Sequence, residues 1–481
     1  MSNSKKDDLL RLQGLEDLIE GGLKEWKVPG LALSVVKDGE LLFSGGYGFR
    51  VPESGLKMNA DTLYRIASNT KAFVSMSLAI LADEGKLDWD KPVRHYIPYF
   101  RLKDKYASEH VTPRDLLCHR TGLPAHDGAL HDFNTRKEMV ENLQYLESSY
   151  PIRTKHQYNN LMYMTAGHLV DCIAGQKWES FVQERIFAPL GMEKSNFSFV
   201  KSRLTENFAE CYYMKEDELR QYKFNSGAAD PEYIYPRSPS GGINTTANEM
   251  ADWMLLQLNK GEFKGKRVVS EKAFAEMHSP QMIDNWNSPY EEYGESSCGL
   301  GWFIWAYRGE KLVVHGGFFG SQVYLMPKRN IGITIMPTLG SPLADIVLCN
   351  IFDRLLELDQ IDWTSRKLKE REDAKRNQQP AVSDQIKGTS PSQPLEAFCG
   401  EYCDRGYGKL SIKSDGSRLF IENEGHNHYL RHYHYDTFEL LESDGEAFCK
   451  ATFHTDAKGV ISSVSVPFEP AVKDIVFTRS A

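Results

Sequence analysis

Apolar positions near the start of the chain repeat first at the spacing of a helix and then at that of strands. Leucine or isoleucine stands at positions 12, 15, 19 and 23, so residues 9–26 are predicted to form a helix with one apolar face. Two apolar runs follow, residues 31–36 and 41–43, and an Asp-Gly pair lies between them. Because Asp-Gly between apolar runs is a strong hairpin signal, a two-stranded hairpin is predicted next.

After Gly299 the pattern changes to short apolar runs separated by turns, which is typical of successive antiparallel strands. The predicted strands are residues 300–307, 312–315, 322–326 and 331–336, and a helix over residues 343–358 is expected to cover them. The region from about 135 to 285 is predicted to form helices joined by long polar loops. The early hairpin and the late strands then build one mixed sheet from both ends of the domain.

The last quarter of the chain has a different composition. Residues 364–394 carry charge runs and then a Gly, Pro and Ser-rich stretch, which is typical of a linker. Beyond it, seven short strands separated by turns predict a small all-β sandwich or barrel. The predicted organisation is therefore a domain over residues 1–363, a linker over 364–394 and a β domain over 395–481.

Composition narrows the classes of function. The chain has 481 residues, 41% of them hydrophobic and 26% charged, with a net charge of −9, so we expect a globular protein without a nucleic-acid or anionic-membrane partner. No apolar run reaches about 18 residues, so no membrane span is expected. The polar start does not resemble a signal peptide, and the eight cysteines form no CxxC pair. We therefore expect reduced thiols and a cytoplasmic location.

Ser68 and Lys71 stand three residues apart at the head of the apolar run 72–82. In a helix both side chains lie on one face, where a lysine can help to remove the proton of a serine nucleophile. The helix N-terminus adds N–H groups that can stabilise an oxyanion. The Ser-x-x-Lys pattern occurs five times in the chain, but only Ser68 opens an apolar helix. The alternative is that Ser68 is an ordinary helix cap.

Two further motifs provide partners for this pair. Tyr158 and Asn160 lie in a polar stretch at a predicted helix start, where Tyr158 could relay the Ser68 proton and Asn160 could bind a substrate amide. The alternative for Tyr158 is a cap on a packed loop.

The second motif, His315-Gly316-Gly317-Phe318, ends a predicted strand. Gly316 and Gly317 allow a substrate to lie against the strand edge, and the Phe318 N–H would complete an oxyanion hole with the Ser68 N–H. His315 would add a hydrogen-bond donor. The alternative is a Gly-Gly bulge beside a core histidine.

Taken together, these motifs resemble the serine β-lactamase and penicillin-binding-protein family, and most closely its class C-like branch of DD-peptidases, D-aminopeptidases and esterases. The resemblance extends from about Leu12 to about Leu358. Further landmarks lie in the same order along the chain, namely residues 85–93, 116–124, 187–192, 240–242 and 299–302. It implies an α/β (α+β) fold with a mixed antiparallel sheet flanked by helices, plus an all-helical subdomain. It also implies an acyl-enzyme at Ser68, with Lys71 and Tyr158 as the proton-transfer pair.

The chain departs from the family pattern in one place. True β-lactamases usually carry Lys-Thr-Gly where this chain has His315-Gly316-Gly317. A histidine is mostly neutral above about pH 7, so the fixed charge for a substrate carboxylate is missing and an esterase or peptidase is favoured. The C-terminal β domain resembles the lipocalin-like appendage of some members.

The resulting prediction is a serine hydrolase acting on a small ester or amide, including a D-amino-acid peptide or a lactam. An acyltransferase using the same acyl-enzyme and a non-catalytic penicillin-recognition protein remain as alternatives. An α/β-hydrolase would need a Gly-x-Ser-x-Gly elbow, which the chain lacks. No cofactor and no metal are predicted, although histidines at 426, 428, 432 and 434 on one strand leave a zinc site as a minor alternative. The expected partner is a small molecule or short peptide, and homo-oligomerisation is left open.

Overall fold

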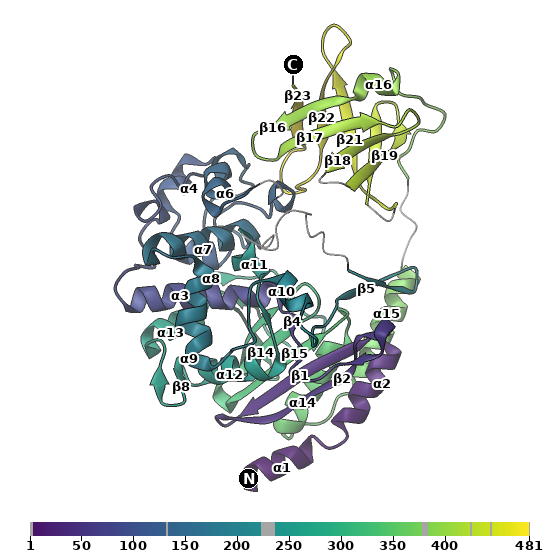
Figure 1. The fold of residues 1–481 in the computed structure, drawn as a ribbon. Helices are drawn as coiled ribbons and strands as arrows, with labels where there is room; N and C mark the ends of the chain where they lie inside the picture. The colour runs from purple at the N-terminus through teal and green to yellow at the C-terminus, as the bar shows by residue number, and fades with distance from the viewer. Residues whose placement is uncertain are drawn as a thin grey trace. The chain divides into compact units, whose positions relative to one another are not determined.

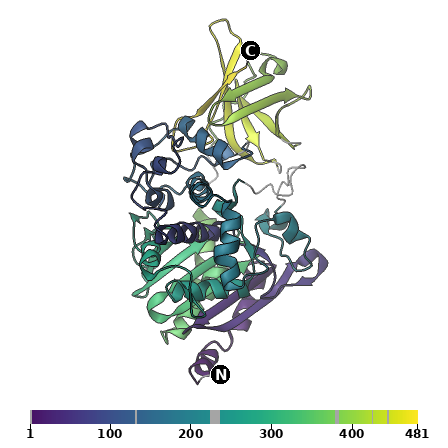
Figure 2. The same cartoon turned by 60° about the vertical axis from the view of Figure 1, so that its left-hand side comes forward.

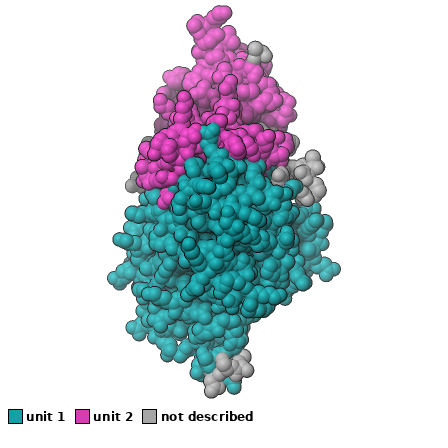
Figure 3. Space-filling view, turned by 90° about the vertical axis from the view of Figure 1, so that its left-hand side faces the viewer, with its two compact units in different colours: residues 1–97, 112–119, 162–378 teal, residues 98–111, 120–161, 379–481 magenta. Residues whose placement is uncertain are grey.

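The computed structural model describes residues 3–130, 133–222, 236–377, 383–423, 426–442 and 445–480. The chain forms two compact units, each built from segments that are far apart in the sequence (Figure 3). Unit 1 consists of residues 1–97, 112–119 and 162–378, and unit 2 consists of residues 98–111, 120–161 and 379–481. The C-terminal region thus shares a unit with part of the helical region. The boundaries at 363 and 395 stay a prediction, and residues 378–382 of the predicted linker lie outside the described residues.

Unit 1 is organised around a nine-stranded antiparallel sheet with the order β10-β11-β12-β13-β14-β15-β1-β2-β3 (Figure 1). The first and last parts of the domain meet in its middle, where β1 pairs with β15 and Leu33 lies opposite Ile335. This confirms the prediction that both ends of the domain build one sheet, and all of its strand pairs are antiparallel. The strands are β1 (Gly30–Lys37), β2 (Glu40–Val51), β3 (Leu56–Lys57), β10 (Met282–Ile283), β11 (Ser297–Cys298), β12 (Phe303–Tyr307), β13 (Glu310–Gly316), β14 (Gln322–Met326) and β15 (Ile331–Pro337).

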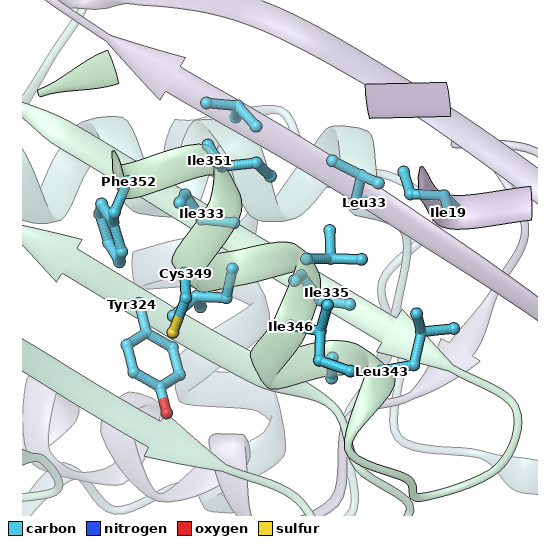
Figure 4. Close-up of a cluster of buried hydrophobic side chains, with 14 of the residues drawn as sticks. Ile19, Leu33, Tyr324, Ile333, Ile335, Leu343, Ile346, Cys349, Ile351 and Phe352 are labelled. Atoms are coloured by element: carbon cyan, nitrogen blue, oxygen red, sulfur yellow. The ribbon is translucent and has the colours of Figure 1, made fainter. Parts of the chain in front are cut away.

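Both faces of the central strands are covered by helices. Leu33 and Ile335 pack into a core with helices α2 (Leu15–Glu25) and α14 (Leu343–Leu355) (Figure 4). Because side chains alternate along a strand, the next residue, Ser34, faces the other side, where its hydroxyl donates to the Ala247 carbonyl at the start of helix α12 (Ala247–Leu258). The central strands β1 and β15 are therefore buried on both faces.

The predicted N-terminal helix is interrupted. Residues 3–25 form two helices, α1 (Asn3–Arg11) and α2, with Gly14 between them at a φ of +83°. A left-handed φ is readily adopted by glycine, and Gly14 with this φ is the N-cap residue of α2. The leucines at 12 and 15 still belong to one core, so the apolar face was predicted correctly although the helix was not continuous.

Helix α3 (Lys71–Asp83) lies in the interior of unit 1, and its residues from 71 to 81 are all buried. Helix α5 (Pro113–Leu117) begins with a capping box in which the Thr112 hydroxyl accepts from the backbone N–H of Asp115, which confirms the predicted cap. The other helices of unit 1 are α7 (Asn160–Ala174), which begins in unit 2, α8 (Trp178–Val182), α9 (Ala188–Leu190), α10 (Phe199–Arg203), α11 (Ser238–Gly241), α13 (Glu271–Met277) and α15 (Trp363–Asn377).

Helix α15 occupies the first part of the segment predicted as a linker. Its first residue, Trp363, is buried, and its indole N–H donates to the buried Asp353 carboxylate at 3.3 Å. Arg366 forms an ion pair with Glu292 at 2.8 Å. The charged residues of this segment therefore belong to a helix that is part of unit 1. Composition alone did not reveal this helix.

Unit 2 contains a closed barrel of the strands β16 to β23 (Figure 2), which confirms the predicted β domain. The strand missing from the sequence prediction is β16, because Tyr402 is its one buried apolar residue. The strands are β16 (Gly400–Asp404), β17 (Gly408–Ser414), β18 (Leu419–Asn423), β19 (His426–His434), β20 (Thr437–Leu441), β21 (Ala447–Thr455), β22 (Ile461–Val466) and β23 (Ile475–Arg479). The unit also holds helices α4 (Lys105–His110), α6 (Arg136–Asn142) and α16 (Leu395–Phe398).

None of the helices formed by the described residues is long and apolar enough to cross a membrane.

Candidate active site

Ser68 lies in a tight turn that the sheet and two short strands hold in place. The turn is the 3₁₀ segment η2 (Ala67–Thr70), which leads directly into α3. It follows strand β4 (Tyr64–Arg65), which pairs with β7 (Asn244–Thr245). Ala67 adopts a φ of +46°, an uncommon conformation for a residue with a side chain. A sharp, over-determined turn of this kind presents the Ser68 side chain, which is half-buried, at the head of the helix.

Lys71 is fully buried and reaches Ser68. Its Nζ donates to Ser68 Oγ at 3.0 Å and to the Ser240 carbonyl oxygen at 2.7 Å. It also lies 5.4 Å from the centroid of the Tyr163 ring. The carbonyl of α11 therefore fixes the ammonium group beside the serine hydroxyl, within the range in which a proton can pass between the two side chains.

A buried clamp joins the Ser68 turn to the start of strand β14. The Ser321 hydroxyl donates to the Ile66 carbonyl at 3.0 Å, and Asn69 Nδ2 lies 3.0 Å from the same hydroxyl and 3.1 Å from the same carbonyl. Asn69 and Ser321 are both buried. Sequence reasoning missed both residues. The signal for Asn69 was a buried-looking amide between Ser68 and Lys71, whereas nothing local in the sequence connects Ser321 with position 66.

The end of strand β13 packs against this turn. A Cβ atom at Gly317 would lie 2.4 Å from the Ile66 carbonyl oxygen, so only glycine fits there without a shift. The Gly317 N–H donates to the Ser321 carbonyl at 2.7 Å. Phe318 follows immediately, so its backbone N–H belongs to the turn that lies next to residues 66 and 67. The predicted neighbourhood of the Gly-Gly motif and the Ser68 turn is thus present in unit 1.

His315 is 3% exposed and neutral. Its Nδ1 lies 2.9 Å from the Gly316 carbonyl oxygen, and because a carbonyl can only accept, Nδ1 is the donor. A neutral imidazole has one N–H group, so Nε2 carries no proton. Burial, and then the positive charge of Lys71, lower the pKa of His315 to about 3. The imidazole therefore provides no positive charge at neutral pH.

Aromatic side chains gather beside the Gly-Gly motif. Phe318 is 72% exposed, and its ring meets Phe319 edge-on at a centroid distance of 5.1 Å. Tyr222 contacts both rings, at 5.8 Å and 5.5 Å. An exposed phenylalanine supported by two further rings offers an apolar surface next to the Ser68 turn.

The Tyr158 motif belongs to unit 2, where Tyr158 is half-buried directly before helix α7. Asn159 is buried, and its Nδ2 donates to the carbonyl oxygens of Leu123 and Pro124. The structure thus confirms the predicted helix start and shows that the residue between the two predicted site residues is a structural anchor.

Asn160 is the first residue of α7, and its Nδ2 donates to Asp127 Oδ1 at 3.1 Å. The amide that was predicted to bind substrate therefore has a carboxylate partner within unit 2. The structure brings Ser68, Lys71 and the His315–Phe318 segment together in unit 1, and it holds Tyr158 and Asn160 on one loop system in unit 2.

Two histidines of strand β19 each form a hydrogen bond with a backbone group. His432 Nε2 donates to the Tyr435 carbonyl at 2.9 Å, and His434 Nδ1 accepts from the Ile386 N–H at 3.3 Å. Among the residues that the structure describes, no group of three or more His, Cys, Asp or Glu side chains is arranged to hold a metal ion.

Comparison with known proteins places the chain in a family. The family model described as Beta-lactamase matches residues 15–357, and a domain of unknown function, DUF3471, matches residues 384–479. The chain is 25% identical over 497 residues to the unguisins hydrolase ungD' of Aspergillus campestris, which covers 96% of this chain and 90% of that protein. It is 28% identical over 461 residues to the unguisins hydrolase ungD of Aspergillus violaceofuscus, which covers 87% of this chain and 79% of that protein.

Solved structures share the fold. A structure described as the octameric penicillin-binding protein homologue from Pyrococcus abyssi superposes with a TM-score of 0.63 at 22% identity, covering 97% of this chain and 100% of that chain. EstCE1, described as a hydrolase with promiscuous acyltransferase activity, superposes with a TM-score of 0.62 at 17% identity. The superposition covers 74% of this chain and 100% of the EstCE1 chain. Because the family model matches most of the chain, this protein belongs to the beta-lactamase family and has relatives that are hydrolases.

Proposed function

We propose that the protein is a serine hydrolase that cleaves a small ester or amide through an acyl-enzyme on Ser68. The observation that carries the proposal is the buried Lys71, whose Nζ lies 3.0 Å from Ser68 Oγ at the head of α3. A lysine is costly to bury without partners, and here the serine hydroxyl and the Ser240 carbonyl are partners that hold it in a position to handle a proton.

In the proposed reaction, Ser68 Oγ attacks the substrate carbonyl carbon while its proton moves to the member of the Lys71 and Tyr158 pair that is unprotonated at that moment. The oxyanion is stabilised by the backbone N–H groups of Ser68 and Phe318. When the bond to the leaving alcohol or amine breaks, the leaving group takes up the proton, and acyl-Ser68 remains. Water then attacks the ester carbonyl, a proton returns to Ser68 Oγ, and the free acid leaves.

The surroundings of the serine favour an uncharged acyl group. His315 is neutral, and Gly316 has no side chain, so this strand end offers no positive charge for a substrate carboxylate. Phe318 offers an exposed aromatic face instead. Esters and amides with apolar acyl groups are therefore the proposed substrates, with D-amino-acid peptides and lactams as outcomes of the same test.

The test is intact-mass spectrometry after incubation with p-nitrophenyl esters, D-amino-acid anilides and a penicillin. Ser68→Ala removes the nucleophile, and Ser54→Ala is the matched control because Ser54 belongs to another, exposed Ser-x-x-Lys pattern. We expect an acyl mass gain and product release in the wild type and in Ser54→Ala, and neither in Ser68→Ala. Turnover that survives Ser68→Ala would exclude the mechanism.

Adding an alcohol or amine acceptor to the same assay separates hydrolysis from acyl transfer. Hydrolysis releases the free acid whatever acceptor is present, whereas an acyltransferase forms a new ester or amide in proportion to the acceptor concentration. An adduct with penicillin that is not released would instead indicate a penicillin-recognition protein.

Homo-oligomerisation is also part of the proposal, since the Pyrococcus abyssi homologue is described as octameric and covers 97% of this chain. Light scattering of the purified protein tests it, and a monomeric mass at all concentrations would exclude it.

A further inference from the structure

A buried histidine in unit 2 connects the helical segments with the C-terminal barrel. His126 is 0% exposed and lies in the loop before helix α6, with a φ of +47°. Its Nε2 donates to the Glu147 carbonyl oxygen at 2.8 Å. Its backbone N–H donates to Glu469 Oε2 at 2.8 Å, and its Nδ1 lies 2.6 Å from the Tyr407 hydroxyl. Two of these three partners come from the barrel.

The protonation of this contact follows from its partners. Because a carbonyl oxygen only accepts, Nε2 carries the proton, and burial lowers the pKa of His126, so the ring is neutral. Burial also raises the pKa of Tyr407, so its hydroxyl keeps the proton and donates it to Nδ1. Every polar atom of His126 that can form a hydrogen bond here has a partner of the right kind.

The barrel side of the contact is held rigidly. Tyr407 lies in the turn between β16 and β17, where its N–H and that of Gly406 both donate to Asp404 Oδ1, at 2.9 Å and 2.8 Å. The Tyr407 ring stacks on Phe468 with a centroid distance of 6.0 Å. The Gly406 carbonyl accepts a second bond from the helical segments, from Asn142 Nδ2 at 2.8 Å.

The other side of the same loop holds the Tyr158 motif. Asp127 follows His126 directly, and its carboxylate accepts from Asn160 Nδ2 at 3.1 Å. The carbonyls of residues 123 and 124, a few residues earlier, accept from Asn159 Nδ2. One short loop therefore forms hydrogen bonds with the barrel through residue 126 and with the Tyr158 motif through residues 123, 124 and 127.

We propose that the C-terminal barrel is a positioning domain for the Tyr158–Asn160 motif, and that Tyr407 and His126 are the positioning residues that join the two. The proposal rests on the proposed function, because that function gives Tyr158 its part in proton transfer. It assigns a function to the matched domain of unknown function, which acts through the loop and needs no contact with substrate.

The test uses the full-length chain with Tyr407→Phe, which removes the hydroxyl and keeps the ring that stacks on Phe468. Tyr435→Phe is the matched control, because Tyr435 is an exposed barrel tyrosine. Hydrogen exchange is followed by mass spectrometry in peptides that cover residues 123–127 and 156–161. We expect exchange in these peptides to rise about fivefold or more in Tyr407→Phe and to stay at the wild-type rate in Tyr435→Phe, because a loop that loses an anchor opens more often.

Kinetics provide the second measurement. A displacement of about 1 Å in a proton-transfer group lowers the rate by up to about a hundredfold, so kcat should fall about tenfold or more in Tyr407→Phe while KM stays within about threefold. A merely structural role would leave kcat per folded molecule unchanged. If Tyr407→Phe does not fold, Glu469→Ala decides by the same two measurements, because it removes the acceptor of the His126 N–H and lies outside the strands.

The outcomes separate this proposal from the proposed function. Wild-type exchange in residues 123–127 and 156–161 of the variant overturns the positioning role, as does faster exchange with an unchanged kcat. If the wild type shows no Ser68-dependent turnover, the proposed function fails, and the exchange measurement alone then decides whether the barrel orders the motif.

Discussion

Replacing Gly317 by alanine tests the packing on which the candidate site depends. An alanine Cβ at this position would lie 2.4 Å from the Ile66 carbonyl oxygen and 2.2 Å from Ser321 Oγ. At the neighbouring Gly316, the nearest atom to a new Cβ is the Ser321 carbonyl oxygen at 3.8 Å, an ordinary contact. The two glycines are thus a matched pair, one without space for a methyl group and one with space.

The magnitude follows from the distances. Carbon and oxygen atoms normally stay at least about 3.3 Å apart, so the end of β13 and the turn at residue 66 must separate by about 1 Å in Gly317→Ala. Overpacking of this kind costs about 1–3 kcal/mol of unfolding free energy. A shift of about 1 Å between the Phe318 N–H and Ser68 should also lower kcat/KM by about a hundredfold.

Urea unfolding followed by tryptophan fluorescence is the appropriate assay, because all eight tryptophans lie in unit 1 and report on its unfolding alone. With a slope of about 3 kcal/mol per molar urea, the midpoint should fall by about 0.3–1 M in Gly317→Ala. In Gly316→Ala it should stay within about 0.2 M of the wild type. A Gly317→Ala protein with the wild-type midpoint and the wild-type kcat/KM would refute the close approach of β13 to the Ser68 turn.

Three further predictions concern individual site residues. Lys71→Met should lower the rate of p-nitrophenol release by about a hundredfold or more. Lys57→Met, in an exposed Ser-x-x-Lys pattern, should leave this rate unchanged. Equal rates in the two variants would exclude Lys71 from the mechanism. Tyr158→Phe should slow acylation by at least about a hundredfold in a stopped-flow burst, and a normal burst would assign proton transfer to Lys71 alone. Burial depresses the folded-state pKa of His315 to about 3, below the value of about 6.5 in the unfolded chain. The corresponding free energy of unfolding is fully present above pH 6.5 and is lost as the pH falls towards 3, by up to about 1.4 kcal/mol per pH unit. Urea midpoints between pH 7 and 4.5 should therefore fall less in His315→Gln than in the wild type or in the exposed His95→Gln, and identical slopes would show that His315 is not buried as a neutral ring.

Much of the fold could be predicted because the apolar pattern of the sheet is local. The hairpin of β1 and β2 and the strands β12 to β15 follow from period-two runs and turn residues. Two features could not be predicted in this way. Strand β16 buries one apolar side chain, so its pairing is decided by neighbouring strands in the barrel. Helix α15 looks like a linker because its charged residues dominate, and the buried Trp363 that fixes it contacts an aspartate ten residues earlier.

In the candidate site, too, local relations could be predicted from the sequence and contacts between distant positions could not. Ser68 and Lys71 could be paired from their spacing, because three residues in a helix bring side chains to one face. The contact of Ser321 with Ile66 joins positions 255 apart, and no local pattern indicates it. The surroundings of His315 are equally nonlocal, since the Phe303 ring that contacts it and the Lys71 charge that helps to lower its pKa come from other elements.

The contact of His126 with the barrel has a consequence for synthesis of the chain. His126 and Glu469 are 343 positions apart. At about 5–20 residues per second, the ribosome needs roughly 20–70 seconds to make the barrel residue after the histidine has been made. During this time the loop that carries residues 123–127 has no barrel partner, and its polar groups form hydrogen bonds with water or with other parts of the chain. The order of the segments therefore means that this loop can form its barrel contacts only after the C-terminal part of unit 2 has been made.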